Sequence, residues 1–224
     1  MNNSLKTSYF LPSSAVLEMT YLCNHTCLFC SCPWEHQESH YKKGKELSIE
    51  EWKQCIDKLI DYGVTSFSYT GGEPFLNKNL KEIVAYVNSK KAHYINEELE
   101  IEDKAPAQFI ISNGQLIDDE KLDFIKRENI NLSMSMPGMR TYNVHTQNGE
   151  CDKILNLFKK AKELEIHTTV NITVTKKNLF ELYETISNAL IAGADTLLIN
   201  RFLPGGRGMS YVDELLLNKE ETIE

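Results

Sequence analysis

The sequence alternates six times between short β-rich runs and amphipathic helical stretches, and this pattern limits the possible folds more than any other feature. Several of the β-rich runs are nearly continuous apolar or β-branched segments, as expected for strands covered by helices. Such alternation predicts right-handed crossovers and a parallel sheet. We therefore expect an α/β fold, either an open barrel or a doubly wound sheet. The strands are predicted at residues 15–19, 65–70, 108–112, 130–136, 167–174 and 195–200.

The predicted helices are marked by apolar stripes at helical spacing and by their caps. Ser48 and Glu51 can form a capping box at the start of the first helix, which ends at Gly63. Asp118 is placed to cap the third helix, and Gly193 follows the fifth. The stripes contain Ile49, Trp52, Ile56, Leu59 and Ile60; Leu80, Ile83, Val84 and Val87; Leu122 and Ile125; Ile154, Leu155, Phe158 and Ala161; and Leu179, Leu182, Ile186 and Leu190.

Two segments outside these units carry weaker signals. The acidic stretch 96–104 is expected to be a solvated loop or an extension of the second helix. Asn218 and Glu221 indicate the start of another helix, although a single turn does not sustain itself in water. We expect the chain to be cut from a longer protein and to divide into a tail over 1–14, a core over 15–208 and the start of a C-terminal extension over 209–224.

The composition excludes several classes of protein. The formal net charge of −8 argues against a nucleic-acid partner, because phosphate binding depends mainly on clustered Lys and Arg. No apolar run approaches the roughly 20 residues needed to cross a bilayer, and the N-terminus lacks a secretory signal. These features predict a cytoplasmic protein with no membrane partner. Six cysteines are too few for a disulfide scaffold, and four of them fall between Cys23 and Cys32, which suggests a metal site.

Three of these cysteines belong to the stretch CNHTCLFC at residues 23–30, just after the first predicted strand. Thiolates are soft ligands suited to zinc or to an iron–sulfur cluster. A tight loop brings three sulfurs to one face of a cubane and leaves its fourth iron open to a small molecule, whereas clusters that only carry electrons usually have four cysteines. The alternative is a zinc-bound structural or interaction module that uses Cys32, His25 or His36 as the fourth ligand.

Turn-forming residues gather at the carboxyl ends of the predicted strands, where parallel α/β folds place their sites. The turns are Gly71-Gly72-Glu73-Pro74 after the second strand, Asn113-Gly114 after the third, Met136-Pro137-Gly138 after the fourth and Pro204-Gly205-Gly206-Arg207-Gly208 after the sixth. We expect a functional site at this edge of the sheet.

The cysteine spacing C-x3-C-x-(aromatic)-C, followed by a GGEP turn after the next strand, closely resembles the radical SAM (S-adenosylmethionine) superfamily. The resemblance covers nearly the whole chain and implies a partial (β/α)6 TIM-like barrel. It implies a 4Fe–4S cluster on Cys23, Cys27 and Cys30, with S-adenosylmethionine chelating the open iron. An electron from the reduced cluster then cleaves the cofactor, and the 5′-deoxyadenosyl radical removes hydrogen from a substrate. Such an enzyme also needs an electron donor, such as flavodoxin or ferredoxin.

The resemblance implies several contacts to S-adenosylmethionine. Phe29 would lie beside the adenine. The turn Gly71, Gly72, Glu73 and Pro74 would meet the methionine amino group, and its glycines would let the backbone come close. The candidates for ribose or carboxylate contacts are Ser112, Asn113 and Ser135, followed at later strand ends by Asn171 and Arg201.

Some features resemble the subgroup with a C-terminal SPASM or twitch domain, many of whose members mature ribosomally made peptides. These features are Ser112-Asn113-Gly114, Ser133 with Ser135, and the run 200–204 entering a Gly-Arg-Gly turn. Members often have Ser-x-Asp-Gly where this chain has Ser135-Met136-Pro137-Gly138, so that acid is missing here. The resemblance implies crosslinking, epimerisation or oxidation of a peptide or protein side chain. The alternatives are small-molecule or cofactor biosynthesis and an inactive, cofactor-binding fragment.

Overall fold

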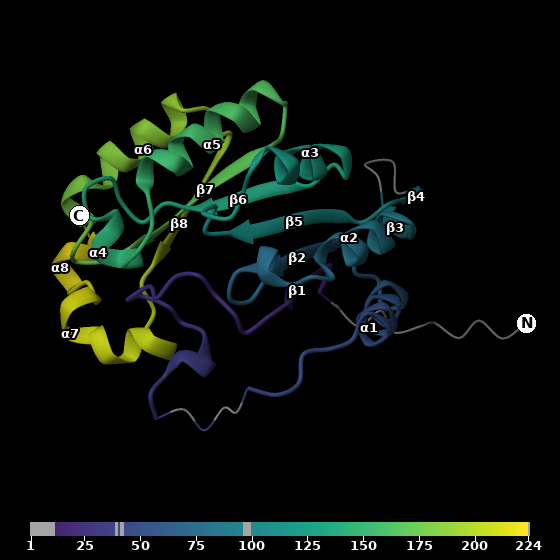
Figure 1. The fold of residues 1–224 in the computed structure, drawn as a ribbon, viewed down its shortest axis with the longest axis horizontal. Helices are drawn as coiled ribbons and strands as arrows, with labels where there is room; N and C mark the ends of the chain where they lie inside the picture. The colour runs from purple at the N-terminus through teal and green to yellow at the C-terminus, as the bar shows by residue number, and fades with distance from the viewer. Residues whose placement is uncertain (1–11, 39, 41–42, 96–99, 224) are drawn as a thin grey trace, which may run out of the picture.

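The computed structural model describes residues 12–38, 40, 43–95 and 100–223, which form a six-stranded parallel sheet with its helices and one small hairpin (Figure 1). Every predicted strand is confirmed to within one residue at each end. The strands of the sheet are β1 (Ser14–Glu18), β2 (Ser66–Thr70), β5 (Ala107–Ser112), β6 (Asn131–Ser135), β7 (Thr168–Val174) and β8 (Thr196–Arg201).

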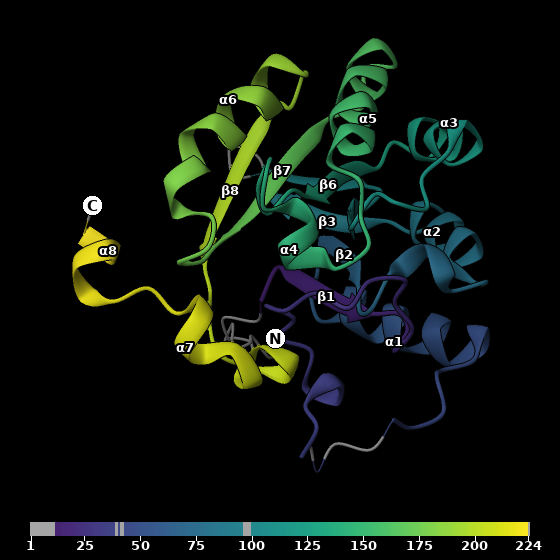
Figure 2. The ribbon, with the colours of Figure 1, turned by 60° about the vertical axis from the view of Figure 1, so that its left-hand side comes forward.

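The order of the strands in the sheet, β1-β2-β5-β6-β7-β8, selects the barrel over the doubly wound sheet. A doubly wound sheet reverses the direction in which strands are added and so places helices on both faces. Here the direction never reverses, so right-handed crossovers place the helices on one face, as Figure 2 shows. In the described part of the chain, β1 pairs only with β2, and β8 only with β7, so the barrel is open. The large helices are α1 (Ile49–Asp61), α2 (Leu80–Asn88), α3 (Asp119–Arg127), α5 (Cys151–Glu163) and α6 (Leu182–Ile191).

Side chains that alternate along the strands separate a buried outer layer from a polar inner face. In β7, Val170, Ile172 and Val174 are buried on the helix side, whereas Asn171 and Thr173 point the other way and stay partly exposed. None of the described helices covers the inner face, and most of the polar residues there keep access to solvent, although Ser133 is buried. The hydroxyl and amide side chains on this face include Ser68, Thr70, Ser133, Ser135, Asn171, Thr173 and Asn200.

The capping signals are confirmed. Glu51 N–H donates to Ser48 Oγ over 3.2 Å, and Ser48 N–H donates to Glu51 Oε2 over 2.7 Å, which completes the capping box of α1. Asp118 Oδ1 accepts from Lys121 N–H over 2.9 Å at the start of α3. These local bonds satisfy backbone donors that a helix leaves open at its first turn.

The prediction of an apolar stripe on the last large helix, α6, is wrong at the C-terminal end of the stripe. Leu190 is 47% exposed, whereas Thr185 and Ala189 of α6 are buried. This helix packs on β7, and the next strand, β8, is the edge of the sheet and is exposed along its length. A helix at the edge of a sheet has fewer neighbouring elements, so fewer residues of its apolar stripe are buried.

The prediction for the acidic segment before the third predicted strand is also wrong. Ile101–Lys104 forms strand β4, which pairs antiparallel with β3 (Ala92–Ile95); residues 96–99 lie outside the described part. Tyr94 Oη donates to the Thr65 carbonyl over 2.6 Å. This contact fixes the hairpin against the start of β2, and a reading of local charge could not reveal it.

Short helices fill the remaining connections. Asn218 begins α8 as predicted, because its side chain accepts from Glu221 N–H over 2.8 Å. The sequence gives no cap signal for α4, whose N-cap Thr141 makes no side-chain cap bond. The short elements are η1 (Pro33–Glu35), η2 (Pro74–Leu76), α4 (Tyr142–Thr146), η3 (Leu179–Glu181), η4 (Gly206–Tyr211), α7 (Val212–Leu215) and α8 (Lys219–Ile223).

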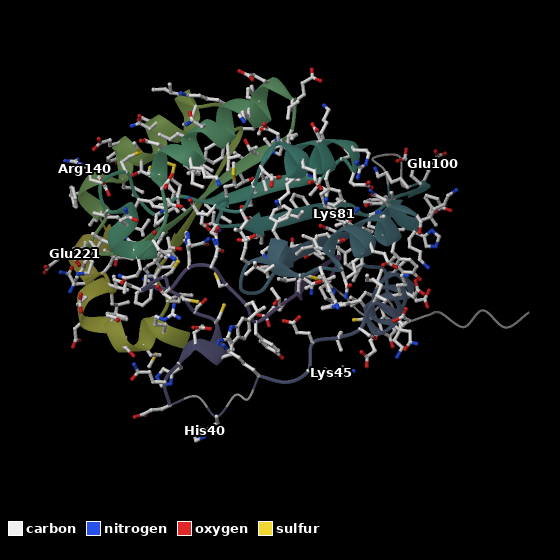
Figure 3. All side chains as sticks on the ribbon, in the orientation of Figure 1. His40, Lys45, Lys81, Glu100, Arg140 and Glu221 are labelled. Atoms are coloured by element: carbon white, nitrogen blue, oxygen red, sulfur yellow. The ribbon has the colours of Figure 1, made fainter. Side chains whose placement is uncertain are left out.

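Charged side chains project from both ends of the molecule, with Arg140 and Glu221 at one end and Glu100 at the other (Figure 3). Among the helices of the described residues, none is long and apolar enough to traverse a bilayer. Leu215, beyond the predicted end of the core at residue 208, is fully buried against Leu28 and Phe202. The division of the chain at residue 208 stays a prediction.

We expect Ser48→Ala to lower the free energy of unfolding by about 1 kcal/mol, because the N-cap bond is lost. Urea unfolding followed by circular dichroism measures the change. Ser187→Ala is the matched control, since Ser187 lies exposed in the middle of α6, where Ala is the better helix former. Equal stability of Ser48→Ala and the unchanged chain would contradict the role of the cap.

Candidate functional site

A cavity of about 610 Å³ lies at the carboxyl ends of the strands, where the turns of the barrel meet. It brings together the cysteine-containing loop after β1 and residues at the ends of the other five strands, and most of the predicted site residues line it. These are Cys23, Cys27, Phe29, Cys30, Gly71, Gly72, Ser112, Asn113, Ser135, Asn171 and Arg201. In the described part of the chain, the wall includes neither Glu73 nor Pro74.

The cysteine loop, residues 22–32, is shaped by backbone bonds within it and to α4. Cys30 N–H donates to the Cys27 carbonyl over 3.2 Å, which makes a tight turn, and Leu28 N–H donates to the His145 carbonyl over 2.9 Å. His25 N–H points at Cys23 Sγ, 3.4 Å away. The loop thereby turns three free thiols toward one cavity.

The environment of these thiols suits a soft metal centre. Burial raises the pKa of the Cys27 thiol to about 12, and the neighbouring Cys30 and Cys23 add to the effect. Burial likewise raises the pKa of Cys23, whereas a hydrogen bond from Cys32 lowers the pKa of Cys30. Binding of a metal would compensate the negative charge that burial disfavours. The donor set therefore fits an iron–sulfur cluster.

The zinc alternative needs a different arrangement of ligands from an iron–sulfur cluster. Within the described residues, no three His, Cys, Asp or Glu side chains are grouped to hold one metal ion, which the zinc alternative requires. Ligands of a cubane bind different irons and need not converge on one point. Cys32 lies beside Cys30, and its Sγ is 3.5 Å from the Gly71 carbonyl oxygen. Both residues line the cavity, so the Gly71 carbonyl lies at the cavity wall.

The glycine turn after β2 packs directly on the backbone around the cysteine loop. Gly72 N–H donates to the Thr20 carbonyl over 2.7 Å. A Cβ on Gly71, whose φ is +122°, would come within 2.6 Å of Thr20 O, and a Cβ on Gly72 within 2.0 Å of Leu22 O. Neither position has room for a side chain. The two glycines thus bring the turn and the cysteine loop into contact.

Gly71 and Gly72 line the cavity, whereas Glu73 lies behind its wall. Its side chain is fully buried and accepts from Ser112 Oγ (2.9 Å), from Asn113 N–H (2.9 Å) and from Phe75 N–H (3.3 Å). Asn113 Nδ2 then donates to Asn24 Oδ1 over 2.8 Å. The carboxylate therefore ties the turn after β2 to the turn after β5, and Asn113 continues the connection to the cysteine loop.

The later strand ends contribute polar groups to the same wall. Asn200 Nδ2 donates to Asn171 Oδ1 over 3.2 Å, which fixes two amides side by side on the inner face. Ser135 and Arg201 line the cavity from β6 and β8. Phe29 lies with its ring centroid 5.8 Å from that of His145. The cavity thus has a sulfur-rich side and an amide-rich side.

Two histidines near the loop differ in their bonding. His145 has a structural role, because Nδ1 lies 2.9 Å from the Thr141 carbonyl and Nε2 lies 2.8 Å from Thr175 Oγ1. His25 is buried with Nδ1 3.9 Å from Cys27 Sγ, and no described residue bonds its Nε2. The structure therefore places His25 against a predicted cluster ligand.

A C-terminal segment closes one side of the site, and it contains the turn 204–208 that was predicted at this edge of the sheet. Residues 202–216, here called the strap, run beside the cysteine loop and η1 (Figures 1 and 2). Gly208 N–H donates to the Cys30 carbonyl over 3.0 Å, and a Cβ on Gly206 would come within 2.2 Å of the Cys32 carbonyl. The repeated glycines around Arg207 are the sequence signal for this close approach.

Comparison with known proteins agrees with this site. The family model described as the radical SAM superfamily matches residues 17–189. The chain is 28% identical over 220 residues to the sporulation killing factor maturation protein SkfB of Bacillus subtilis (strain 168), with 96% of this chain and 48% of the relative covered. It is 28% identical over 205 residues to the PqqA peptide cyclase of Bradyrhizobium diazoefficiens, with 87% and 47% covered. The chain spans about half the length of these relatives.

A solved structure shares the fold. Streptococcus suis SuiB bound to its precursor peptide SuiA superposes with a TM-score of 0.68 at 18% identity, over 86% of this chain and 40% of SuiB. At this level of identity the likeness concerns the architecture. It agrees with the open barrel that the strand order gives.

The buried Glu73 makes the stability of the metal-free chain depend on pH. Burial raises the pKa of its carboxyl from 4.5 to about 6, although it accepts three hydrogen bonds. The folded chain therefore holds the proton more tightly than the unfolded chain, so the stability from this group is complete below pH 4.5 and is lost as pH rises through about 6. We expect the stability of the unchanged chain relative to Glu73→Gln to fall by about 2 kcal/mol over this range, as measured by urea unfolding. A pH-independent difference would refute this expectation.

Gly72→Ala should push the Leu22–Cys23 backbone away and cost about 1–3 kcal/mol of stability, as overpacking does. Thermal unfolding of the metal-free chain and iron content after reconstitution measure the two effects. Gly44→Ala is the matched control, because the nearest atom to its Cβ would be Tyr21 Oη at 3.9 Å. If both variants behave alike, the close packing at Gly72 has no role.

Proposed function

The chain belongs to the radical SAM superfamily, and we propose that it is the cofactor-binding core of an enzyme that modifies a peptide by radical chemistry. The observation that carries the proposal is that three cysteines of one loop and the glycine turn after β2 share one cavity. The family model covers most of the barrel, from β1 through α6. The substrate and the activity of the whole protein are part of the proposal.

Cys23, Cys27 and Cys30 would hold the 4Fe–4S cluster, and the strap and α4 would keep their loop in place. When bound, the cluster and S-adenosylmethionine supply a 5′-deoxyadenosyl radical that takes hydrogen from the substrate. The protein itself would bind and orient the cofactor and the substrate, and would exclude water from the site. The apolar contacts of Leu28 support this role, because Leu28 packs with the buried side chains of Phe202 and Leu215 and so anchors the cysteine loop.

The backbone of Gly71 and Gly72 would receive the methionine amino group, with the Gly71 carbonyl as an acceptor at the cavity wall. Glu73 supports this turn from behind through Ser112 and Asn113. Phe29 would contact the adenine. For the ribose and carboxylate, the proposed polar contacts are Asn113, Ser135, Asn171 and Arg201, which line the same cavity.

A peptide is the substrate that the comparisons favour. The names of two relatives describe the maturation of a sporulation killing factor and the cyclisation of a peptide, and SuiB is bound to a precursor peptide. The open edge of the barrel and the hydroxyl and amide groups of its inner face would accept a polypeptide, whose backbone offers many donors and acceptors. Flavodoxin or ferredoxin would supply the electron.

Replacing Cys23, Cys27 or Cys30 with Ala should abolish the brown colour after anaerobic reconstitution and the dithionite-dependent release of 5′-deoxyadenosine. Visible absorbance, iron content and chromatography measure these losses. Cys55→Ala, on α1 and away from the cavity, is the control and should retain both properties. Unchanged iron content in any of the three variants would remove the basis of the proposal.

The peptide class is tested with the whole protein and the short peptides encoded beside its gene. We expect mass loss or mass-neutral epimerisation in one of these peptides, and hydrogen transfer from a deuterated peptide into 5′-deoxyadenosine. If only small molecules give this transfer, the enzyme belongs to small-molecule or cofactor biosynthesis instead.

A further inference from the structure

The strap carries one charged side chain into the cysteine loop. Arg207 Nη1 donates to the Cys27 carbonyl over 3.2 Å, and Nη2 forms an ion pair with Glu35. The side chains of Arg207 and Glu35 are only 23% and 21% exposed. One guanidinium therefore connects the cysteine loop, η1 and the strap, which are far apart in the sequence.

The contact uses the planar shape of the guanidinium. A fork of donors can hold a carbonyl and a carboxylate at once, whereas a lysine ammonium offers a point charge on a flexible stem. The Cys27 carbonyl also accepts from Cys30 N–H, so its orientation determines the turn between these two cysteines. Fixing this carbonyl from outside the loop therefore restricts the backbone that carries both thiols.

The ion pair of Arg207 and Glu35 also places a positive and a negative charge near the thiols. Arg207 and Glu35 both line the cavity with Cys27 and Cys30. Glu35 also pairs with Lys43 over 3.3 Å, so its carboxylate offsets two cations. Reduction of a cluster adds negative charge, and nearby charges shift its midpoint potential. Arg207 would raise that potential, and Glu35 would lower it.

We propose that Arg207 is a positioning residue for the cluster site, which fixes the turn from Cys27 to Cys30 through its two-point contact and, balanced by Glu35, sets the charge around the bound cluster. The first half concerns the protein alone. The second half rests on the proposed function, because it needs a cluster on the three cysteines.

Hydrogen exchange of the metal-free chain tests the first half. In Arg207→Gln we expect amides of residues 24–32 to exchange about tenfold faster, since a hydrogen bond to a charged group and its ion pair are lost. Arg207→Lys should also exchange faster, because it lacks the fork. Arg140→Gln is the matched control, since Arg140 pairs with Glu184 outside the cavity. Unchanged exchange in Arg207→Gln would overturn the positioning role.

Redox titration of the reconstituted chain, followed by electron paramagnetic resonance, tests the second half. We expect Arg207→Gln to shift the midpoint potential to more negative values and Glu35→Gln to shift it to less negative values. Arg207→Lys should stay near the unchanged chain, because it keeps the charge. A merely structural effect would move Arg207→Gln and Glu35→Gln in the same direction, and that result would overturn the charge role. Failure of the unchanged chain to bind a cluster would instead refute the proposed function, and the exchange result would still stand.

Discussion

The strands of this sheet are added in one direction, so crossovers of the usual right hand pack the large helices on the same face of the sheet. As a result, the described helices bury one face of the sheet, which can be apolar, and leave the other face uncovered. This arrangement also collects the carboxyl ends of the strands, with their turns, around one opening. The buried Val170 and Ile172 and the half-exposed Asn171 and Thr173 of β7 are its direct result.

Around that opening, short segments are held by contacts to one another more than by regular structure. The Glu73 carboxylate gathers Ser112 and the backbone of Asn113, and Asn113 reaches Asn24. A buried carboxylate without a cationic partner is costly, and three hydrogen bonds to it offset part of that cost. Such a network has few alternative arrangements, so it favours one geometry for the turns that carry the site.

The sequence predicted the features that depend on local pattern. Alternating strands, the Ser48 cap and the turn residues at strand ends are local, and all are confirmed. The open barrel followed from the resemblance, because periodicity does not encode strand order. The hairpin held by Tyr94 and the partly exposed end of α6 depend on neighbours far along the chain, so local reading missed both.

The same limit applies to the site. Cysteine spacing and the glycine turn identified two of its walls, but Glu73 was expected to meet the cofactor and the structure places it behind the wall. The strap was read as a turn followed by an extension. Its contact with the cysteine loop joins residues at opposite ends of the chain, and only the glycines around Arg207 hinted at it.

The distance between these ends has a consequence for biosynthesis. Arg207 follows Cys27 by 180 residues, and a ribosome adds about 5–20 residues per second. The thiols are therefore made roughly 10–40 seconds before the arginine that braces their loop. Until Arg207 has been added, the nascent chain lacks the strap, so iron and sulfide delivered before then would meet a loop without this contact. The cysteine loop therefore gains its contact with Arg207 only after the strap has left the ribosome.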